Sequence, residues 1–165
     1  MIAFNFPASP SPGQTYTDGG ITYIWDGTSW AGQSSPLLMA SAAQWLADTA
    51  GLALVTDPVW AAAGPAALVD AATIVLDMST FINATVTLGG NRTLGNPTNP
   101  KNGQTGAIEI KQDETGSRTL AYGSNWKFAS GTAPTLTLGA NARDVLFYYV
   151  VSSTVIMGSL VKAVG

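Results

Sequence analysis

The chain has 165 residues, of which 46% are hydrophobic and 10% are charged, against about 25% charged in an average globular protein. The hydrophobic content excludes a disordered chain, and the length suffices for one domain of about 100–150 residues plus a small appendage. Seven basic and ten acidic side chains give a net charge of −3, without the basic patch that binding to a nucleic-acid backbone requires. We therefore expect no nucleic-acid partner.

Two residue types that carry much of enzyme chemistry are missing. The chain has no cysteine and no histidine, which removes thiol nucleophiles, disulfides, the usual general base and the commonest metal ligand. Carboxylates remain, but Asp113 and Glu114 are neighbours in a predicted turn, where adjacent side chains point apart. We expect no enzyme, no catalytic residues, no metal and no cofactor.

The low charge of so apolar a chain predicts association. Few charges are available to keep a lone copy in solution, and large exposed apolar surfaces usually mark interfaces. We expect a homo-oligomer. The longest apolar run, residues 145–151, is far shorter than the ~20 residues of a membrane helix, and the N-terminus lacks signal-peptide features. We therefore expect a protein made in a cytoplasm, without membrane insertion.

Residues 1–33 predict a small β-meander. Prolines and glycines favour an extended start, and residues 21–25 alternate between two faces as a strand does. Asp26 and Gly27 supply a turn. We expect strands at 14–17, 21–25 and 29–31.

Residues 34–66 predict one helix followed by a linker. Ser34 or Ser35 can cap the helix and Pro36 suits its first position, while an apolar stripe continues through Trp45 and Leu46. Gly51 provides a stop. Beyond it, the pairs Asp57-Pro58 and Gly64-Pro65 are expected to break any regular element. Between these pairs, Trp60 and the three alanines after it predict a short turn or half-helix that anchors the linker.

Residues 67–165 predict a mainly β domain, an antiparallel, jelly-roll-like β-sandwich. Short apolar or alternating runs are separated by turn clusters, as in sandwiches and barrels. The run at 145–151 is apolar on both faces, which predicts a central strand covered on both sides. The predicted core contains Ile74, Leu76, Val86, Leu88, Ile108, Ile110, Leu120, Leu136, Val145, Phe147, Tyr149, Ile156 and Leu160.

Two aromatic groups are the candidate contact sites. Tyr23, Trp25 and Trp30 flank the Asp-Gly turn of the meander, and Tyr122 and Trp126 lie near a second turn. Cross-strand aromatic pairs stabilise small sheets, which favours a role in a core or an interface. The alternative is that these rings contact a glycan or a protein partner.

Two stretches resemble a known class of proteins. The first carries Phe-Pro, Gly-Gln-Thr-Tyr and Tyr-x-Trp-Asp-Gly-x-x-Trp between Phe6 and Trp30. It resembles a short module of bacteriophage tail-fibre and virion appendage proteins. The second carries Leu-Gly-Gly-Asn-Arg-Thr-Leu, Asn-Pro-Thr-Asn, Gly-Ser-Arg-Thr-Leu and Trp-Lys-Phe between Leu88 and Phe128. It resembles a β-rich region of phage tail-fibre and minor structural proteins.

The resemblance implies a structural component of a bacteriophage particle, made in the host bacterium and located in the virion. Such a protein would be a tail fibre, a head fibre or spike, or a decoration protein. A trimer that contacts other virion structural proteins is the implied assembly. The alternative function is a glycan-binding module of a receptor-binding fibre that contacts the host surface.

Overall fold

The computed structural model describes residues 6–18, 21–33, 41–47 and 56–164. Contacts between residues divide the chain into two units. One comprises Met1–Met39 with Gly51–Ala53, and the other comprises Ala40–Ala50 with Leu54–Gly165. Each unit is described by itself below.

The first unit contains a three-stranded antiparallel meander. Its strands are β1 (Thr15–Asp18), β2 (Ile21–Trp25) and β3 (Trp30–Gln33), in that order in the sheet. The turn between β2 and β3 is held by Asp26, whose Oδ1 accepts hydrogen bonds from the backbone N–H groups of Thr28 and Ser29, both at 2.7 Å. The predicted meander is confirmed, with strand ends that differ by one or two residues.

The second unit begins with two short helices, α1 (Ala42–Leu46) and α2 (Thr56–Ala63). A capping box starts α1, in which the Ser41 hydroxyl accepts from the Gln44 N–H and the Gln44 side chain accepts from the Ser41 N–H. The predicted caps and start at 34–36 lie outside the described residues. The predicted break at Asp57-Pro58 is wrong, because Pro58 lies in the first turn of α2, where a helix needs no backbone N–H.

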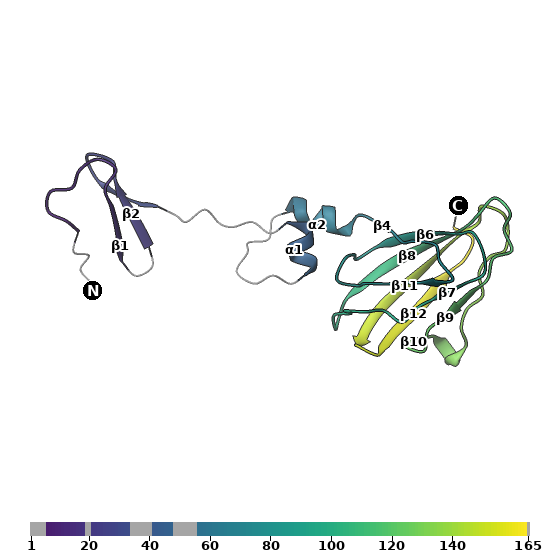
Figure 1. Ribbon diagram of the computed structural model, residues 1–165. Coiled ribbons are helices and arrows are strands. Elements are labelled where there is room, and N and C mark those ends of the chain that lie inside the picture. The colour runs from purple at the N-terminus through teal and green to yellow at the C-terminus, as the bar shows by residue number, and fades with distance from the viewer. Residues whose placement is uncertain (1–5, 19–20, 34–40, 48–55, 165) are drawn as a thin grey trace. The chain divides into compact units, whose positions relative to one another are not determined.

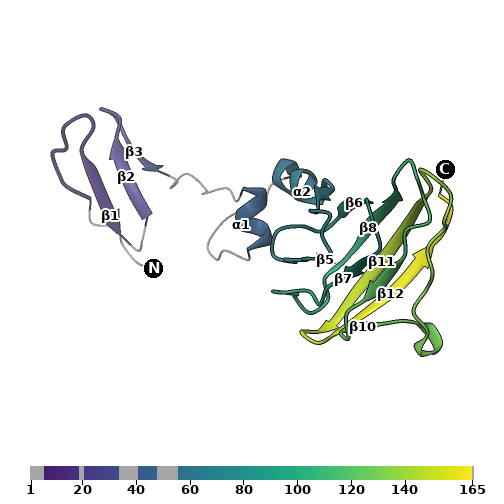
Figure 2. The same ribbon diagram turned by 45° about the vertical axis from the view of Figure 1, so that its right-hand side comes forward.

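Two sheets form the body of the second unit (Figure 1). The larger has six strands in the order β10-β12-β11-β8-β6-β4, and the smaller has three in the order β5-β7-β9. The long strands β8, β11 and β12 run side by side in both views (Figure 1, Figure 2). The bounds are β4 Ala66–Ala67, β5 Thr73–Ile74, β6 Ala84–Leu88, β7 Arg92–Leu94, β8 Thr105–Gln112, β9 Leu120–Tyr122, β10 Trp126–Lys127, the 3-10 helix η1 Ala129–Gly131, β11 Arg143–Ser152 and β12 Val155–Val161.

The chain passes alternately through the two sheets and stacks on itself as a short parallel β-solenoid. Ala66, Ala84 and Ile108 lie in parallel register in the large sheet, while Thr73 and Thr93 do so in the small one. Each of the three coils therefore contributes one strand to each sheet. The β11–β12 hairpin then adds to the third coil in antiparallel register.

The mainly β fold class is confirmed, but the strand arrangement differs from the antiparallel prediction. Five of the seven strand pairs in this unit are parallel, and a jelly roll is not found. Parallel neighbours need a long crossover between them. Here the strand in the opposite sheet serves as that crossover, so the chain needs no helix to return.

The hydrophobic core lies between the two sheets. Side chains from both sheets and from the loops form one buried cluster, which includes Phe81 and Met78 from the corner between β5 and β6. The predicted core residues that the structure confirms as buried are Ile74, Leu76, Val86, Leu88, Ile108, Ile110, Leu120, Leu136 and Ile156.

The predicted facing of β11 is wrong by one residue. Leu146, Tyr148 and Val150 point into the core, while Phe147 and Tyr149 are exposed and Val145 is only half-buried. Leu160 is also half-buried, although it packs against the core. The uniformly apolar run left the choice of face open, and a slip of one residue exchanges the faces of a strand. The pairing with β8 determines which face of β11 is buried, because Leu146 lies opposite Ile108 and buried residues alternate clearly along the C-terminal half of β8.

Candidate interaction surfaces

Side-chain amides tie neighbouring coils together at their corners. The Asn83 Nδ2 donates to the Ala63 carbonyl at 2.8 Å, and its Oδ1 accepts from the Ala107 N–H at 2.9 Å. This one residue therefore joins the end of α2 to the third coil. Other bonds of this kind run from Asn91 to Thr119, from Asn96 to Ser124 and Asn125, and from Gln104 to Met78 and Phe81. In sequence, these residues are indistinguishable from ordinary turn residues, so their role could not be predicted.

A tyrosine of β11 makes a similar tie. The Tyr148 hydroxyl donates to the Ile82 carbonyl at 2.6 Å, and burial raises its pKa to about 12. Gly106 lies opposite Tyr148 on β8, and a Cβ there would clash with the Ile82 carbonyl oxygen. A glycine is therefore required at position 106 for this close approach.

In the meander, aromatic rings gather on one face of the sheet. Trp25 and Trp30 are cross-strand partners with ring centroids 5.6 Å apart. Phe6 stacks on Trp30 at 5.2 Å and meets Tyr16 and Tyr23 edge-on at 5.2 and 5.1 Å. The structure thus brings the three predicted residues of this group into one cluster, which Phe6 and Tyr16 complete. All five side chains are half-buried, so the cluster keeps an accessible surface.

The second predicted aromatic group belongs to the solenoid core. Trp126 is only 5% exposed, and its indole N–H donates to the Gly95 carbonyl at 3.0 Å. Tyr122 packs edge-on against Phe128 at 4.6 Å, and burial, aided by the charge of Asp144, raises its pKa to about 12. Trp126 is therefore largely enclosed and the Tyr122 hydroxyl is buried, although both residues line a cavity of about 380 Å³ with Lys127 and Phe128. A glycan or partner contact at these two residues stays a prediction.

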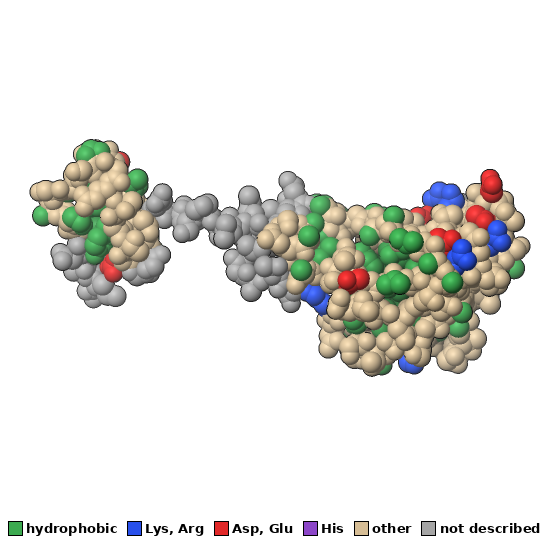
Figure 3. Space-filling view, viewed as in Figure 1, with side chains coloured by type: hydrophobic (Ala, Val, Ile, Leu, Met, Phe, Trp, Pro, Cys, Tyr) green, Lys and Arg blue, Asp and Glu red, His purple; other side chains and the backbone are tan. Residues whose placement is uncertain are grey.

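Each of the three arginines of the second unit pairs with a carboxylate. Arg92 pairs with Asp70 at 2.7 Å, Arg118 pairs with Asp113 at 2.7 Å, and Arg143 with Glu109 at 3.0 Å. Hydrogen bonds from the arginines lower the pKa of Asp70 and of Asp113. On the face in Figure 3, charged side chains are sparse and gather mainly at one end of the unit. No group of three or more acidic residues that could hold a metal ion is found in the described ranges.

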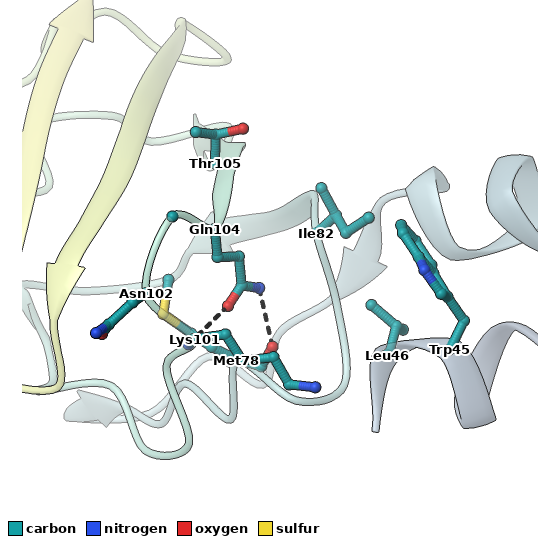
Figure 4. A pocket seen from close by; sticks show the side chains of 9 residues that line it. Trp45, Leu46, Met78, Ile82, Lys101, Asn102, Gln104 and Thr105 are labelled. Atoms are coloured by element: carbon teal, nitrogen blue, oxygen red, sulfur yellow. Dashed lines mark hydrogen bonds between the residues drawn. The ribbon is translucent and has the colours of Figure 1, made fainter. Parts of the chain in front are cut away.

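A cavity of about 470 Å³ lies between α1 and the loop that precedes β8 (Figure 4). Trp45 and Leu46 line one side, and Gln104 lines the other. The Gln104 amide is already used, because its Nε2 donates to the carbonyls of Met78 and Phe81 and its Oε1 accepts from the Lys101 N–H. Among the described residues that line the cavity, Lys101 is the one ionisable side chain, so these residues supply no acid–base pair.

The outer face of the six-stranded sheet carries an exposed apolar ridge. We define this apolar ridge as Val145, Phe147 and Tyr149 of β11 with Met157 and Val161 of β12. Phe147 is 51% exposed, Tyr149 47%, Met157 53% and Val161 48%. Register places Val145 opposite Val161 and Tyr149 opposite Met157, so these side chains are neighbours on one face. The apolar run at 145–151 predicts Val145, Phe147 and Tyr149 in the core, so this surface could not be predicted from the sequence.

Comparisons with known proteins give no relative for this chain. No helix in the described ranges is long and apolar enough to cross a bilayer. No family model, no curated protein and no solved structure matches the chain.

Proposed function

We propose that this protein is an oligomeric structural component of a bacteriophage particle and that it performs no catalysis. The observation that carries the proposal is the apolar ridge. A monomeric protein rarely leaves contiguous large apolar side chains in water, and such surfaces usually mark sites of association. Burying the ridge against other subunits would remove these side chains from water.

The phage assignment is supported by the two sequence resemblances. Their residues occupy defined places in the structure, since Tyr23, Trp25 and Trp30 belong to the aromatic cluster and Asn96 and Trp126 hold coils together. These stretches are thus parts of the scaffold of each unit. A scaffold role for these stretches suits a structural protein, whose function depends on a stable fold.

The direct test is to locate the protein. Antibodies raised against the purified chain, applied with gold labelling to particles of the phage that encodes it, are expected to mark one fixed position on the virion. Protein analysis of the same purified particles should find the chain at a constant ratio to the major capsid protein. Absence from particles that contain all other structural proteins would refute the proposal.

A second candidate function is glycan binding by the aromatic cluster of the meander. It is favoured by the half-buried rings of Trp25 and Trp30, which keep an accessible surface, because indole faces bind sugar rings through stacking. A glycan array probed with the full chain tests it. If the cluster binds, Trp25→Ala should lose the signal and Trp60→Ala should keep it, since Trp60 is 76% exposed on α2, outside the meander. If the unchanged chain gives no signal, glycan binding is refuted and the structural role remains the one proposed function.

A further inference from the structure

The first coil of the solenoid ends the small sheet with a strand that has a neighbour on one side alone. Strand β5 pairs with β7 in the order β5-β7-β9, and the Ile74 carbonyl accepts from the Gly95 N–H at 3.0 Å. Successive residues of a strand direct their backbone groups to opposite sides. Thr73 and Val75 therefore direct their N–H and C=O groups away from β7, where no described residue pairs with them. We call this side the outer edge of β5.

Equivalent residues of two coils show that the missing neighbour leaves surface uncovered. Thr73 and Thr93 are partners in the register of the small sheet. Thr93 has a strand on each side and is half-buried, whereas Thr73 is exposed. Val75 is 73% exposed. The outer edge of β5 thus offers unpaired backbone groups and an apolar side chain together.

The outer edge of β5 also lacks the features that usually keep other chains from pairing with an edge strand. Proteins protect such strands with proline, with charged side chains, with bulges or with a covering segment. In the large sheet, the edge strand β4 lies between Pro65 and Asp70, and the edge strand β10 carries Lys127. Residues 71–76 contain neither a proline nor a charged side chain. An unprotected edge of this kind is a template for an added strand.

A negative charge stands at the end of β5. Asp77 follows Thr73 and Val75 on the outer face of the small sheet, in alternation with buried side chains. Its Oδ1 accepts from the Ser79 hydroxyl at 2.7 Å, from the Ser79 N–H at 3.1 Å and from the Asn99 amide at 3.0 Å, and these bonds lower its pKa. Among the described residues, no lysine or arginine pairs with it, and its Oδ2 accepts no hydrogen bond. This carboxylate is complementary to a basic side chain of a partner.

We propose that the outer edge of β5 binds an extended segment of another protein, which adds a strand to the small sheet. The added strand runs parallel to β5, as the strands of this sheet do. Backbone hydrogen bonds to Thr73 and Val75 hold the segment. A β-branched side chain beside Val75 and a lysine or arginine beside Asp77 select it. This inference goes beyond the proposed function, and it uses the sheet opposite to the one that carries the apolar ridge.

A short peptide tests the edge directly. The probe is acetyl-Thr-Thr-Val-Thr-Lys-amide, mixed with the isotope-labelled full chain, and the readout is hydrogen exchange of the Val75 amide by nuclear magnetic resonance. With the peptide at about ten times its dissociation constant, this exchange should slow about tenfold. The same peptide, N-methylated at its second and fourth residues, cannot form the ladder and should leave the exchange unchanged. Unchanged exchange with the first peptide at millimolar concentration would overturn the proposal. Protection of Val75 without any peptide would also overturn it, because another copy of the chain would then cover the edge.

Three variants, measured by fluorescence anisotropy of the labelled peptide, locate the binding site. Val75→Pro removes an N–H that pairs with no described residue, so it should abolish binding while the chain stays folded by circular dichroism. Val69→Pro is the matched control, since its N–H also points away from the second coil but lies beside β4, and it should bind normally. Asp77→Asn should weaken binding about two- to fivefold, as expected for an exposed ion pair. Full binding by folded Val75→Pro would overturn the site, and gold labelling of particles decides the proposed function independently.

Discussion

Two tyrosine hydroxyls of the solenoid have opposite surroundings. The Tyr148 hydroxyl donates to the Ile82 carbonyl, whereas the Tyr122 hydroxyl is buried without a hydrogen-bond partner among the described residues. A satisfied buried hydrogen bond contributes to stability, while a buried polar atom without a partner opposes it. The two residues therefore offer a matched pair, in which the same substitution removes the same atom.

We expect Tyr148→Phe to lower the free energy of unfolding by about 0.5–1.5 kcal/mol, because it removes a hydrogen bond between coils. Tyr122→Phe should leave that free energy unchanged or raise it, since it removes an unsatisfied polar atom. Urea denaturation of both variants at pH 7 measures the difference. Equal losses in the two variants would contradict the assigned surroundings.

The same tyrosines make stability sensitive to alkaline pH. Burial raises the pKa of each to about 12 in the folded chain, whereas the phenol of an unfolded chain titrates near its ordinary value of 10.0. Above pH 10 the unfolded chain therefore holds fewer protons than the folded one, and stability falls as pH rises. We expect the stability that depends on the neutral form of these two tyrosines to be fully present below pH 10 and to be lost between pH 10 and 12. Urea denaturation across that range should show a flatter decline in the Tyr122→Phe/Tyr148→Phe double variant than in the unchanged chain.

At the scale of elements, the coil corners hold the solenoid in register. Asn83 serves two neighbours at once, since it donates to Ala63 and accepts from Ala107. We expect Asn83→Ala to lower the free energy of unfolding by about 1–3 kcal/mol, because two backbone groups lose their partner. Asn83→Asp, which keeps the acceptor and loses the donor, should still protect the Ala107 amide from hydrogen exchange. If Asn83→Ala leaves that amide fully protected, the side chain does not tie the coils.

Strand β11 separates a core face from an exposed apolar face. We expect Leu146→Ala to lower the free energy of unfolding by about 2–5 kcal/mol at every protein concentration, since Leu146 is fully buried. Phe147→Ala should cost less than about 1.5 kcal/mol within one chain, because half of the ring is already exposed. Its remaining effect should grow with protein concentration, as expected for a residue that acts through association. Urea denaturation at several protein concentrations distinguishes the two variants. A larger loss of unfolding free energy for Phe147→Ala than for Leu146→Ala in dilute solution would contradict the burial of Leu146 and the exposure of Phe147.

Alternation and turn chemistry account for what the sequence could predict of these elements. The meander follows from the alternation of residues 21–25 and the turn at Asp26, and β8 follows from Ile108 and Ile110. Parallel stacking was not predictable from a repeat, because 18 residues separate Ala66 from Ala84 and 24 separate Ala84 from Ile108. Coils of unequal length leave no period in the sequence.

The candidate surfaces were less predictable than the strands. The meander aromatics could be grouped because they are close in sequence, but the burial of Trp126 depends on the Gly95 carbonyl, which is distant in sequence. The apolar ridge was hidden because both faces of β11 are apolar, and only pairing with β8 shows which one is exposed.

At the scale of the whole molecule, the unusual composition has a structural explanation. A chain with only 10% charged residues cannot cover its surface with charge. In the solenoid unit the arginines pair with carboxylates, while β11 and β12 present an apolar surface. Association through that surface would leave the charged groups in solvent and remove the apolar side chains from water, which would reconcile the composition with the proposed structural function.

The decisive test of self-association is the native mass of the full chain over a dilution series from micromolar to nanomolar concentration. We expect the mass of an oligomer at micromolar concentration, with dissociation only on strong dilution. A single folded chain at every concentration would contradict it.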